Sequence, residues 1–199
     1  MSPPVFISEI NYCFRKRTRG ARQDELVILH KRAGLRRVAL ERFVAKAARA
    51  AGLEGTVHVL VAGSPTLRQL NHQFRSKDRA TDVLSFPAPE VLPDRRKASD
   101  RREVAGRPKV AGDIAISAEI AAQSAKRLGH SIADEVRILT LHGILHLAGF
   151  DHERDNGEMA RREADLRRSL GLPLALTERV QPAMGKRKAA RSRRAGKSA

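Results

Sequence analysis

The chain has 199 residues and a mass of 22.0 kDa, which suits a single domain with short appendages. Lys and Arg number 39 against 22 Asp and Glu, and the resulting net charge of +17 excludes an acidic surface and favours RNA, DNA or anionic membrane as partners. No apolar run approaches the roughly 20 residues that a membrane-spanning helix needs, and residues 1–10 lack the apolar segment of a signal peptide. Because its one cysteine, Cys13, cannot form an internal disulfide, we expect a reducing, cytoplasmic setting and no membrane partner.

Three segments are expected to differ from the compact part of the chain. Residues 1–24 are basic and are interpreted as an N-terminal extension. Residues 88–110 combine three prolines with a dense mixture of charges, which indicates a long charged loop. Residues 182–199 are rich in Lys and Arg separated by Ala, Gly and Ser, so they are expected to form a disordered basic tail. The domain itself is predicted to span residues 25–181.

The first half of the domain is predicted to alternate between strands and helices. Leu26–His30 is a short apolar run that indicates a strand, and the alternating valines at 57, 59 and 61 indicate a half-buried one. Helical spacing of apolar residues predicts a helix over residues 36–51, which Gly52 ends. Ser64 and Pro65 are typical of a helix start, with Ser64 expected as the cap residue.

The second half is predicted to contain two strands and then three helices. The strands are expected at Asp82–Phe86 and Asp113–Ile116. Ser117 is expected to cap a helix that runs to residue 128, and Ser131 with Asp134 forms a capping box for a helix of about 17 residues. A last helix places apolar residues on one face and ends at residues 171–173. This order lacks strict alternation, so it predicts an α+β single domain with a small four-stranded sheet and four to five helices.

The most informative segment is residues 141–152, which read Leu-His-Gly-Ile-Leu-His-Leu-Ala-Gly-Phe-Asp-His. His142 and His146 are four residues apart, so they project from the same face of the predicted helix. Gly149 can end that helix in a left-handed conformation, which allows His152 to approach as a third ligand. Three nitrogen ligands leave one tetrahedral position open for water, as in a catalytic zinc site. The sequence therefore predicts a metal site at these three histidines, with zinc favoured over nickel, copper and iron.

The same spacing is the ligand skeleton of the metzincin proteases, so a zinc metalloprotease is one hypothesis. Those enzymes carry a glutamate directly after the first histidine as the general base, and here that residue is Gly143. Glu153 follows the third histidine and is not positioned by the helix. The missing base disfavours peptide hydrolysis and favours a substrate that brings its own charged groups. A phosphodiester meets that requirement and fits the basic composition.

A second cluster, residues 71–87, leaves a helix, crosses a turn with several cations and enters a strand. Arg75 at the helix exit is a candidate for bidentate phosphate recognition, which the guanidinium group suits better than an ammonium does. Lys77 and Arg79 in the following turn are candidate RNA contacts. From spacing alone, a solvated turn or an arginine bonded to the last helical carbonyls is the simpler interpretation.

These two segments, together with Gly-Asp-Ile-Ala-Ile-Ser at residues 112–117, resemble the YbeY family of single-domain, metal-dependent endoribonucleases. The resemblance covers residues 26–173. It implies an α+β fold and one zinc ion bound by His142, His146 and His152. It also implies that Arg75 faces the metal and stabilises the negative charge of the substrate. Asp113 and Ser117 match family positions as well, without an assigned role.

The resemblance further implies a cytoplasmic, single-strand-specific endoribonuclease that acts in 16S ribosomal RNA 3′-end maturation and in ribosome quality control. The implied partners are ribosomal RNA and the small ribosomal subunit, with ribosomal proteins or an assembly GTPase as further candidates. A non-catalytic, zinc-containing ribosome assembly factor is the other alternative, because positive charge supports binding as well as cleavage. Aromatic residues make up only 4% of the chain, so RNA binding is expected to be mainly electrostatic and dependent on salt.

Overall fold

The computed structural model describes residues 27–29, 35–88, 109–152 and 154–174, which form a small α+β domain. The first half contains β1 (Val27–Leu29), α2 (Arg37–Ala51), β2 (Thr56–Ala62), α3 (Ser64–Arg75) and β3 (Val83–Pro87). The second half contains β4 (Val110–Ser117), α5 (Ala118–Leu128), α6 (Ile132–Leu147) and α7 (Glu158–Leu170). The predicted order of helices and strands is confirmed. The predicted N-terminal extension, most of the charged loop and the basic tail lie outside the described residues.

The sheet is mixed, with the order β1-β2-β4-β3. Its three longer strands are β2, β4 and β3, and β1 adds three residues at one edge. β2 pairs in parallel with β1 and β4, whereas β3 runs antiparallel to β4 and forms the other edge. β4 is longer than the sequence predicts, because it pairs with β2 along residues 56–62. Because β3 is the last strand in this order, one of its edges is not paired with any described strand.

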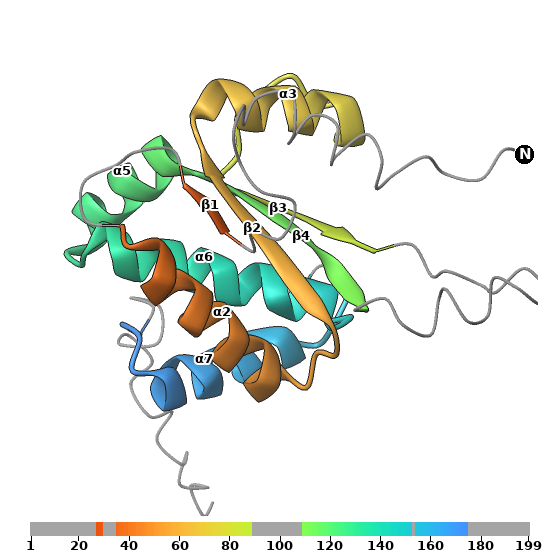
Figure 1. Cartoon of the computed structure of the whole chain (residues 1–199), viewed down its shortest axis with the longest axis vertical. Helices are drawn as coiled ribbons and strands as arrows, with labels where there is room; N and C mark the ends of the chain where they lie inside the picture. Colours follow the sequence, from red (N-terminus) through yellow and green to blue (C-terminus); the bar gives the residue numbers. More distant parts are fainter. Residues whose placement is uncertain (1–26, 30–34, 89–108, 153, 175–199) are drawn as a thin grey trace, which may run out of the picture.

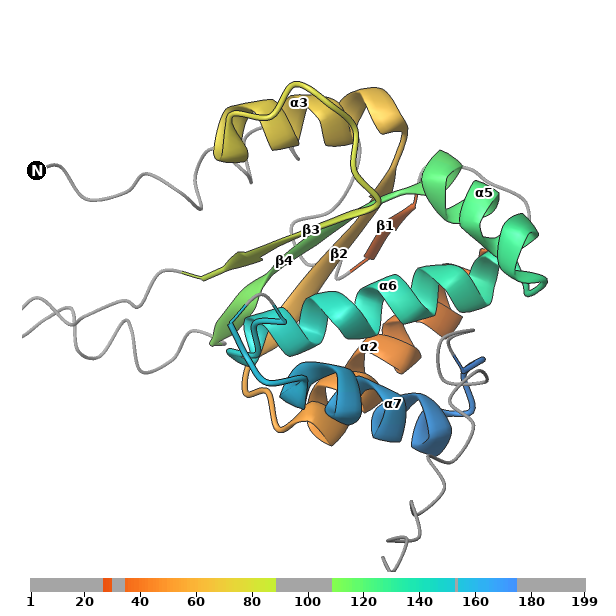
Figure 2. The same cartoon turned by 180° about the vertical axis from the view of Figure 1, so that it is seen from behind.

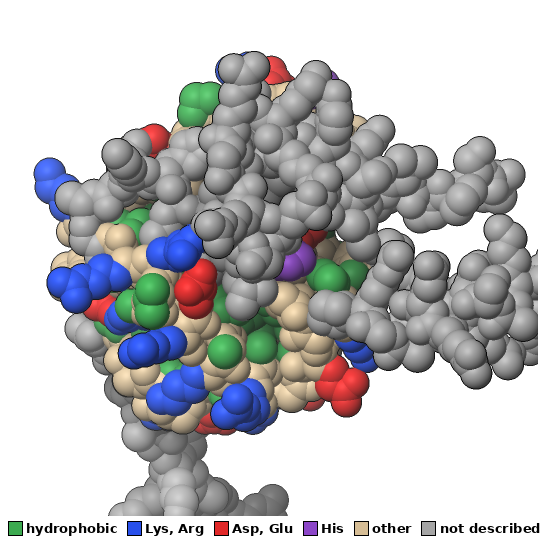
Figure 3. Space-filling model, viewed as in Figure 1, with side chains coloured by type: hydrophobic (Ala, Val, Ile, Leu, Met, Phe, Trp, Pro, Cys, Tyr) green, Lys and Arg blue, Asp and Glu red, His purple; other side chains and the backbone are tan. Residues whose placement is uncertain are grey.

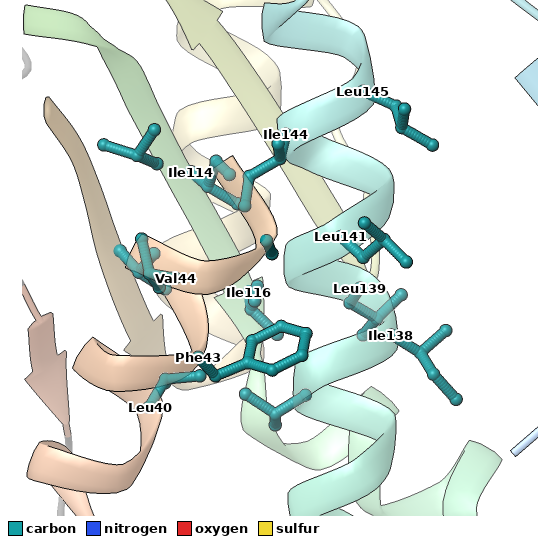
Figure 4. Packing of buried hydrophobic residues seen from close by; sticks show 14 of the residues in the cluster. Leu40, Phe43, Val44, Ile114, Ile116, Ile138, Leu139, Leu141, Ile144 and Leu145 are labelled. Atoms are coloured by element: carbon teal, nitrogen blue, oxygen red, sulfur yellow. The ribbon is translucent and has the colours of Figure 1, made fainter. Parts of the chain in front are cut away.

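The sheet has helices on both of its faces (Figure 1), and buried apolar side chains form a larger cluster on one face and a smaller cluster on the other. One face packs against α2 and α6, with α7 behind them, and the other face carries α3 (Figure 2). Figure 4 shows part of the larger layer, where these buried side chains meet between the helices and β4: Phe43, Val44, Ile114, Ile116 and Ile144. Helix α6 thus packs between the sheet and α7. These contacts determine which side chains of α6 face away from the core. No described helix has the length and apolarity required to cross a membrane.

Local sequence predicts the N-caps of α5 and α6 correctly but not the N-cap of α3. Ser117 and Ser131 cap α5 and α6 as predicted, each accepting a hydrogen bond from a backbone N–H three residues later. The prediction for Ser64 is wrong, since Gly63 is the N-cap residue and supplies no side chain. The backbone N–H of Ser64 instead donates to Glu119 Oε2 at 2.7 Å. A carboxylate from α5 therefore takes the capping role in α3.

Candidate metal centre and groove

The structure brings the three predicted histidines together at the C-terminal end of α6. His142 and His146 project from the helix one turn apart, and the helix ends at Leu147. Gly149 then adopts a φ of +93°, which only glycine reaches readily, and the chain turns back so that His152 approaches. The ring centroids lie 4.8 to 5.5 Å apart, and one nitrogen from each ring lies within 4.8 Å of the others.

The donor atoms fit a first-row transition metal better than calcium or magnesium, which prefer oxygen ligands. Nε2 of His142 and Nε2 of His146 are 3.1 Å apart. Two nitrogens on a tetrahedral zinc ion, with bonds of about 2.0–2.1 Å, would be separated by about 3.3 Å. His152 is exposed, whereas the other two rings are half-buried.

A carboxylate that the sequence prediction missed lies behind the first histidine. Oε2 of Glu163 on α7 is 3.0 Å from Nδ1 of His142, and Arg167 forms an ion pair with Oε1 of the same carboxylate. Because an ionised carboxylate only accepts hydrogen bonds, His142 donates through Nδ1 and keeps a lone pair on Nε2. This is the usual arrangement behind a histidine that binds metal. The sequence did contain one sign of this contact. Glu163 is a charged residue on the same face of α7 as the buried Met159 and Leu166.

The electrostatic environment favours an uncharged His146 and an ionised Glu163. Burial, followed by the neighbouring His142 and His152, lowers the pKa of His146. Burial on its own would raise the pKa of Glu163, but the hydrogen bond from His142 and the charge of Arg167 outweigh it and the pKa is lowered. His146 is therefore uncharged near neutral pH, as a metal ligand must be, and Glu163 is charged, as an acceptor for His142 must be.

Gly143, which stands where the zinc proteases carry their general base, faces the sheet. A Cβ atom at this position would lie 2.8 Å from Cδ1 of Ile114 on β4, so α6 packs against the strand without room for a side chain. A glutamate here would push into the core. The packing thus explains the glycine and leaves no place for the protease base at this position.

The histidines form part of the wall of a groove with a volume of about 1300 Å³. Its other walls come from β3 with its preceding turn, from α7 and from the end of α5. Arg75, the last residue of α3, is exposed and lines the same groove. Lys77 and Arg79 are also exposed, but they lie in the turn after α3 and do not line it. The structure therefore brings Arg75 to the histidine groove and leaves the other two cations outside it.

A family model described as Endoribonuclease YbeY matches residues 24–171. The chain belongs to the YbeY family of endoribonucleases, which are hydrolases acting on RNA. The curated relative from Koribacter versatilis, named Endoribonuclease YbeY, is 50% identical over 156 residues, which are 78% of this chain and 91% of the relative. The relative of the same name from Solibacter usitatus is 44% identical over 149 residues, or 75% and 89% of the two chains.

One solved structure, the solution structure of a Thermotoga maritima protein, aligns with 83% of this chain and 98% of its own. The TM-score is 0.49 and the sequence identity is 24%. At those values the likeness adds nothing to the family assignment, which depends on the family model and the curated relatives.

Asp113 and Ser117, the two other residues of the YbeY-like segments, make side-chain contacts away from the histidines. Oδ1 of Asp113 is 2.9 Å from Nδ1 of His58 on β2. Strand alternation places Asp113 on the face of the sheet opposite α6, because Ile114 faces the larger apolar layer. Ser117 caps α5 and also bonds to Ser64 at 2.8 Å. Neither Asp113 nor Ser117 lines the histidine groove.

Proposed function

We propose that this protein is a single-strand-specific, zinc-dependent endoribonuclease. It acts in the maturation of the 3′ end of 16S ribosomal RNA and in ribosome quality control. The observation that carries the proposal is the meeting of three imidazoles on the wall of an open groove in a chain of the YbeY family. In the proposed site one zinc ion binds His142, His146 and His152.

Each residue around the histidines has a defined part in this proposal. Bound zinc would supply a Lewis acid toward a phosphoryl oxygen and would acidify water. Glu163 orients the ring of His142 through Nδ1, so that Nε2 points to the other histidines. Arg75 stabilises the charge that develops on the phosphate, because its guanidinium group lies on the same groove. Lys77 and Arg79 guide the RNA backbone toward the groove from the adjoining turn.

The proposed partners are ribosomal RNA and the small ribosomal subunit in the cytoplasm, with ribosomal proteins or an assembly GTPase as further contacts. The net charge of +17 supports a polyanionic partner. Figure 3 shows Lys and Arg side chains on the face that includes α2, where Arg42, Lys46 and Arg49 are exposed. Charge of this kind can hold RNA at several places and makes binding sensitive to salt.

That basic face also supports the second candidate, a zinc-containing ribosome assembly factor that binds RNA without cleaving it. The zinc protease is supported only by the spacing of the histidines, and the packing of Gly143 against Ile114 removes the position of its general base. The two RNA-related candidates differ in one property, which is the breakage of the RNA chain by the purified protein.

The test compares metal content and RNA cleavage in the same protein samples. Wild-type protein is expected to contain about one zinc ion per chain and to cut single-stranded RNA more readily than a duplex of the same sequence. His146→Ala is expected to lose both the metal and the cleavage, and Arg75→Ala is expected to keep the metal and lose cleavage. His72→Ala, a change at an exposed histidine of α3, is the matched control and should behave like the wild type. Cleavage that persists in metal-free His146→Ala would refute the proposal, and metal binding without cleavage would favour the assembly factor.

A further inference from the structure

A second polar pair lies in the same groove and takes no part in the histidine centre. Nε2 of His130, in the turn between α5 and α6, is 2.6 Å from Oε2 of Glu135. The two side chains are only 11% and 8% exposed, yet both residues line the groove together with His142 and His146. A negatively charged side chain in this groove would repel the phosphates of RNA. The presence of Glu135 there therefore suggests a role other than phosphate binding.

The pair lies in line with the histidines along α6. Glu135, Leu139, His142 and His146 follow one another at helical spacing, so they share one face of the helix. Glu135 is seven residues before His142, which corresponds to about 10 Å along the helix axis. Between them Ile138 and Leu139 contribute apolar side chains to the groove. The groove therefore presents the histidines, then an apolar floor, and then a carboxylate.

The two oxygens of the Glu135 carboxylate differ in their contacts with the described residues. Oε2 of Glu135 is taken by His130, whereas no hydrogen bond is found between Oε1 and any described residue. Oε1 is also not among the fully buried unpaired atoms of the described residues, which are Asn71 Oδ1 and Arg167 Nε. Glu135 lines the groove, so its carboxylate lies at the groove wall. A carboxylate accepts hydrogen bonds, so this position repels phosphate oxygens and suits a ligand that donates through N–H or O–H.

Single-stranded RNA offers the ribose 2′-hydroxyl and the N–H groups on the edges of the bases, of which only the N–H groups differ between bases, and the amino group of cytosine is a common partner of Glu. We propose that Glu135, held by His130, with Ile138 and Leu139 as an apolar floor, forms a subsite for an unpaired base that carries an exocyclic amino group. This inference rests on the proposed function, because it places that base next to the phosphate at the histidines. Uracil lacks the exocyclic amino group, and its N3–H lies between two carbonyl oxygens that a carboxylate repels, so the subsite disfavours it.

The opposing possibility is that the pair only fastens the turn between α5 and α6. In that case a change at Glu135 would alter stability without altering which base is bound. Oligo(C) and oligo(U) of equal length distinguish the two possibilities, because cytosine and uracil have the same size and differ only in the hydrogen-bonding groups at N3 and C4. The measurement is the dissociation constant of each labelled oligonucleotide for the full chain loaded with zinc, with a gel to verify that the RNA is intact.

The wild type is expected to bind oligo(C) about tenfold more tightly than oligo(U), as one amino–carboxylate contact provides. Glu135→Gln keeps the size of the side chain but adds a donor, so the ratio should fall close to one. The control is Glu54→Gln, which removes the same charge from a side chain that is 83% exposed, and it should retain the ratio. Glu135→Asp, which withdraws the carboxylate by one methylene, should give an intermediate ratio and serves as the second variant if Glu135→Gln unfolds.

Equal binding of the two oligonucleotides by the wild type would overturn the subsite. A preference for oligo(C) that persists in folded Glu135→Gln would overturn it as well. The ratio is a binding quantity, so it can be measured even if the protein cuts no RNA. Failure of the proposed nuclease function would show as an absence of cleavage in the same samples, which keeps the two outcomes separate.

Discussion

The contact between Glu163 and His142 gives the sharpest prediction about the proposed metal site. Glu163→Gln preserves the shape of the side chain and one acceptor oxygen, but it removes the charge that lies 3.0 Å from Nδ1 of His142. Loss of such a partner behind a histidine ligand typically weakens metal binding by about 10- to 100-fold. That range corresponds to about 1.4 to 2.8 kcal/mol of binding free energy. We therefore expect zinc affinity to fall by at least tenfold.

The assay is competition for zinc between the metal-free protein and a chelator of known affinity. Glu163→Ala is a poorer probe, because it leaves Arg167, whose side chain is 14% exposed, without its carboxylate partner and therefore destabilises the fold. Glu158→Gln, at an exposed position in the first turn of the same helix, is the matched control and should bind zinc like the wild type. Wild-type zinc affinity in a folded Glu163→Gln variant would refute the orienting role of this carboxylate.

Three other perturbations test the site and its surroundings. Removal of the metal by a chelator should abolish RNA cleavage and leave the helical circular dichroism signal unchanged. The reason is that the apolar core of the described domain contains none of the three histidines. Loss of the helical signal would contradict this view. Arg75→Ala should reduce the cleavage rate by about 100- to 1000-fold with unchanged zinc content, and a large rate recovery in Arg75→Lys would show that charge matters more than the bidentate geometry. Gly143→Glu should lower the free energy of unfolding by about 1–3 kcal/mol, because the new Cβ would lie 2.8 Å from Ile114. The variant should also show no protease activity. A stable variant that hydrolyses casein would contradict the packing argument.

The sequence predicted those parts of the molecule that depend on near neighbours. The spacing of His142 and His146 needs only a helix, and the approach of His152 needs only a turn at Gly149. The caps at Ser117 and Ser131 act across three residues, so they too could be predicted from sequence alone.

The parts that could not be predicted depend on residues far apart in the chain. The cap of α3 comes from Glu119, which is 55 residues from Ser64, so the local pattern pointed to the wrong group. Glu163 reaches His142 across 21 residues, and its partner could not be identified before α7 was placed against α6. The groove likewise depends on β3 being an edge strand, which follows from strand order rather than from local periodicity.

The three histidines are carried by two different kinds of local structure. Two are fixed on a helix between the sheet and α7, and the third is exposed in the turn beyond Gly149. If zinc binds as proposed, the helix would supply two of its ligands and the turn beyond Gly149 the third, so the position of the third ligand would depend on that turn.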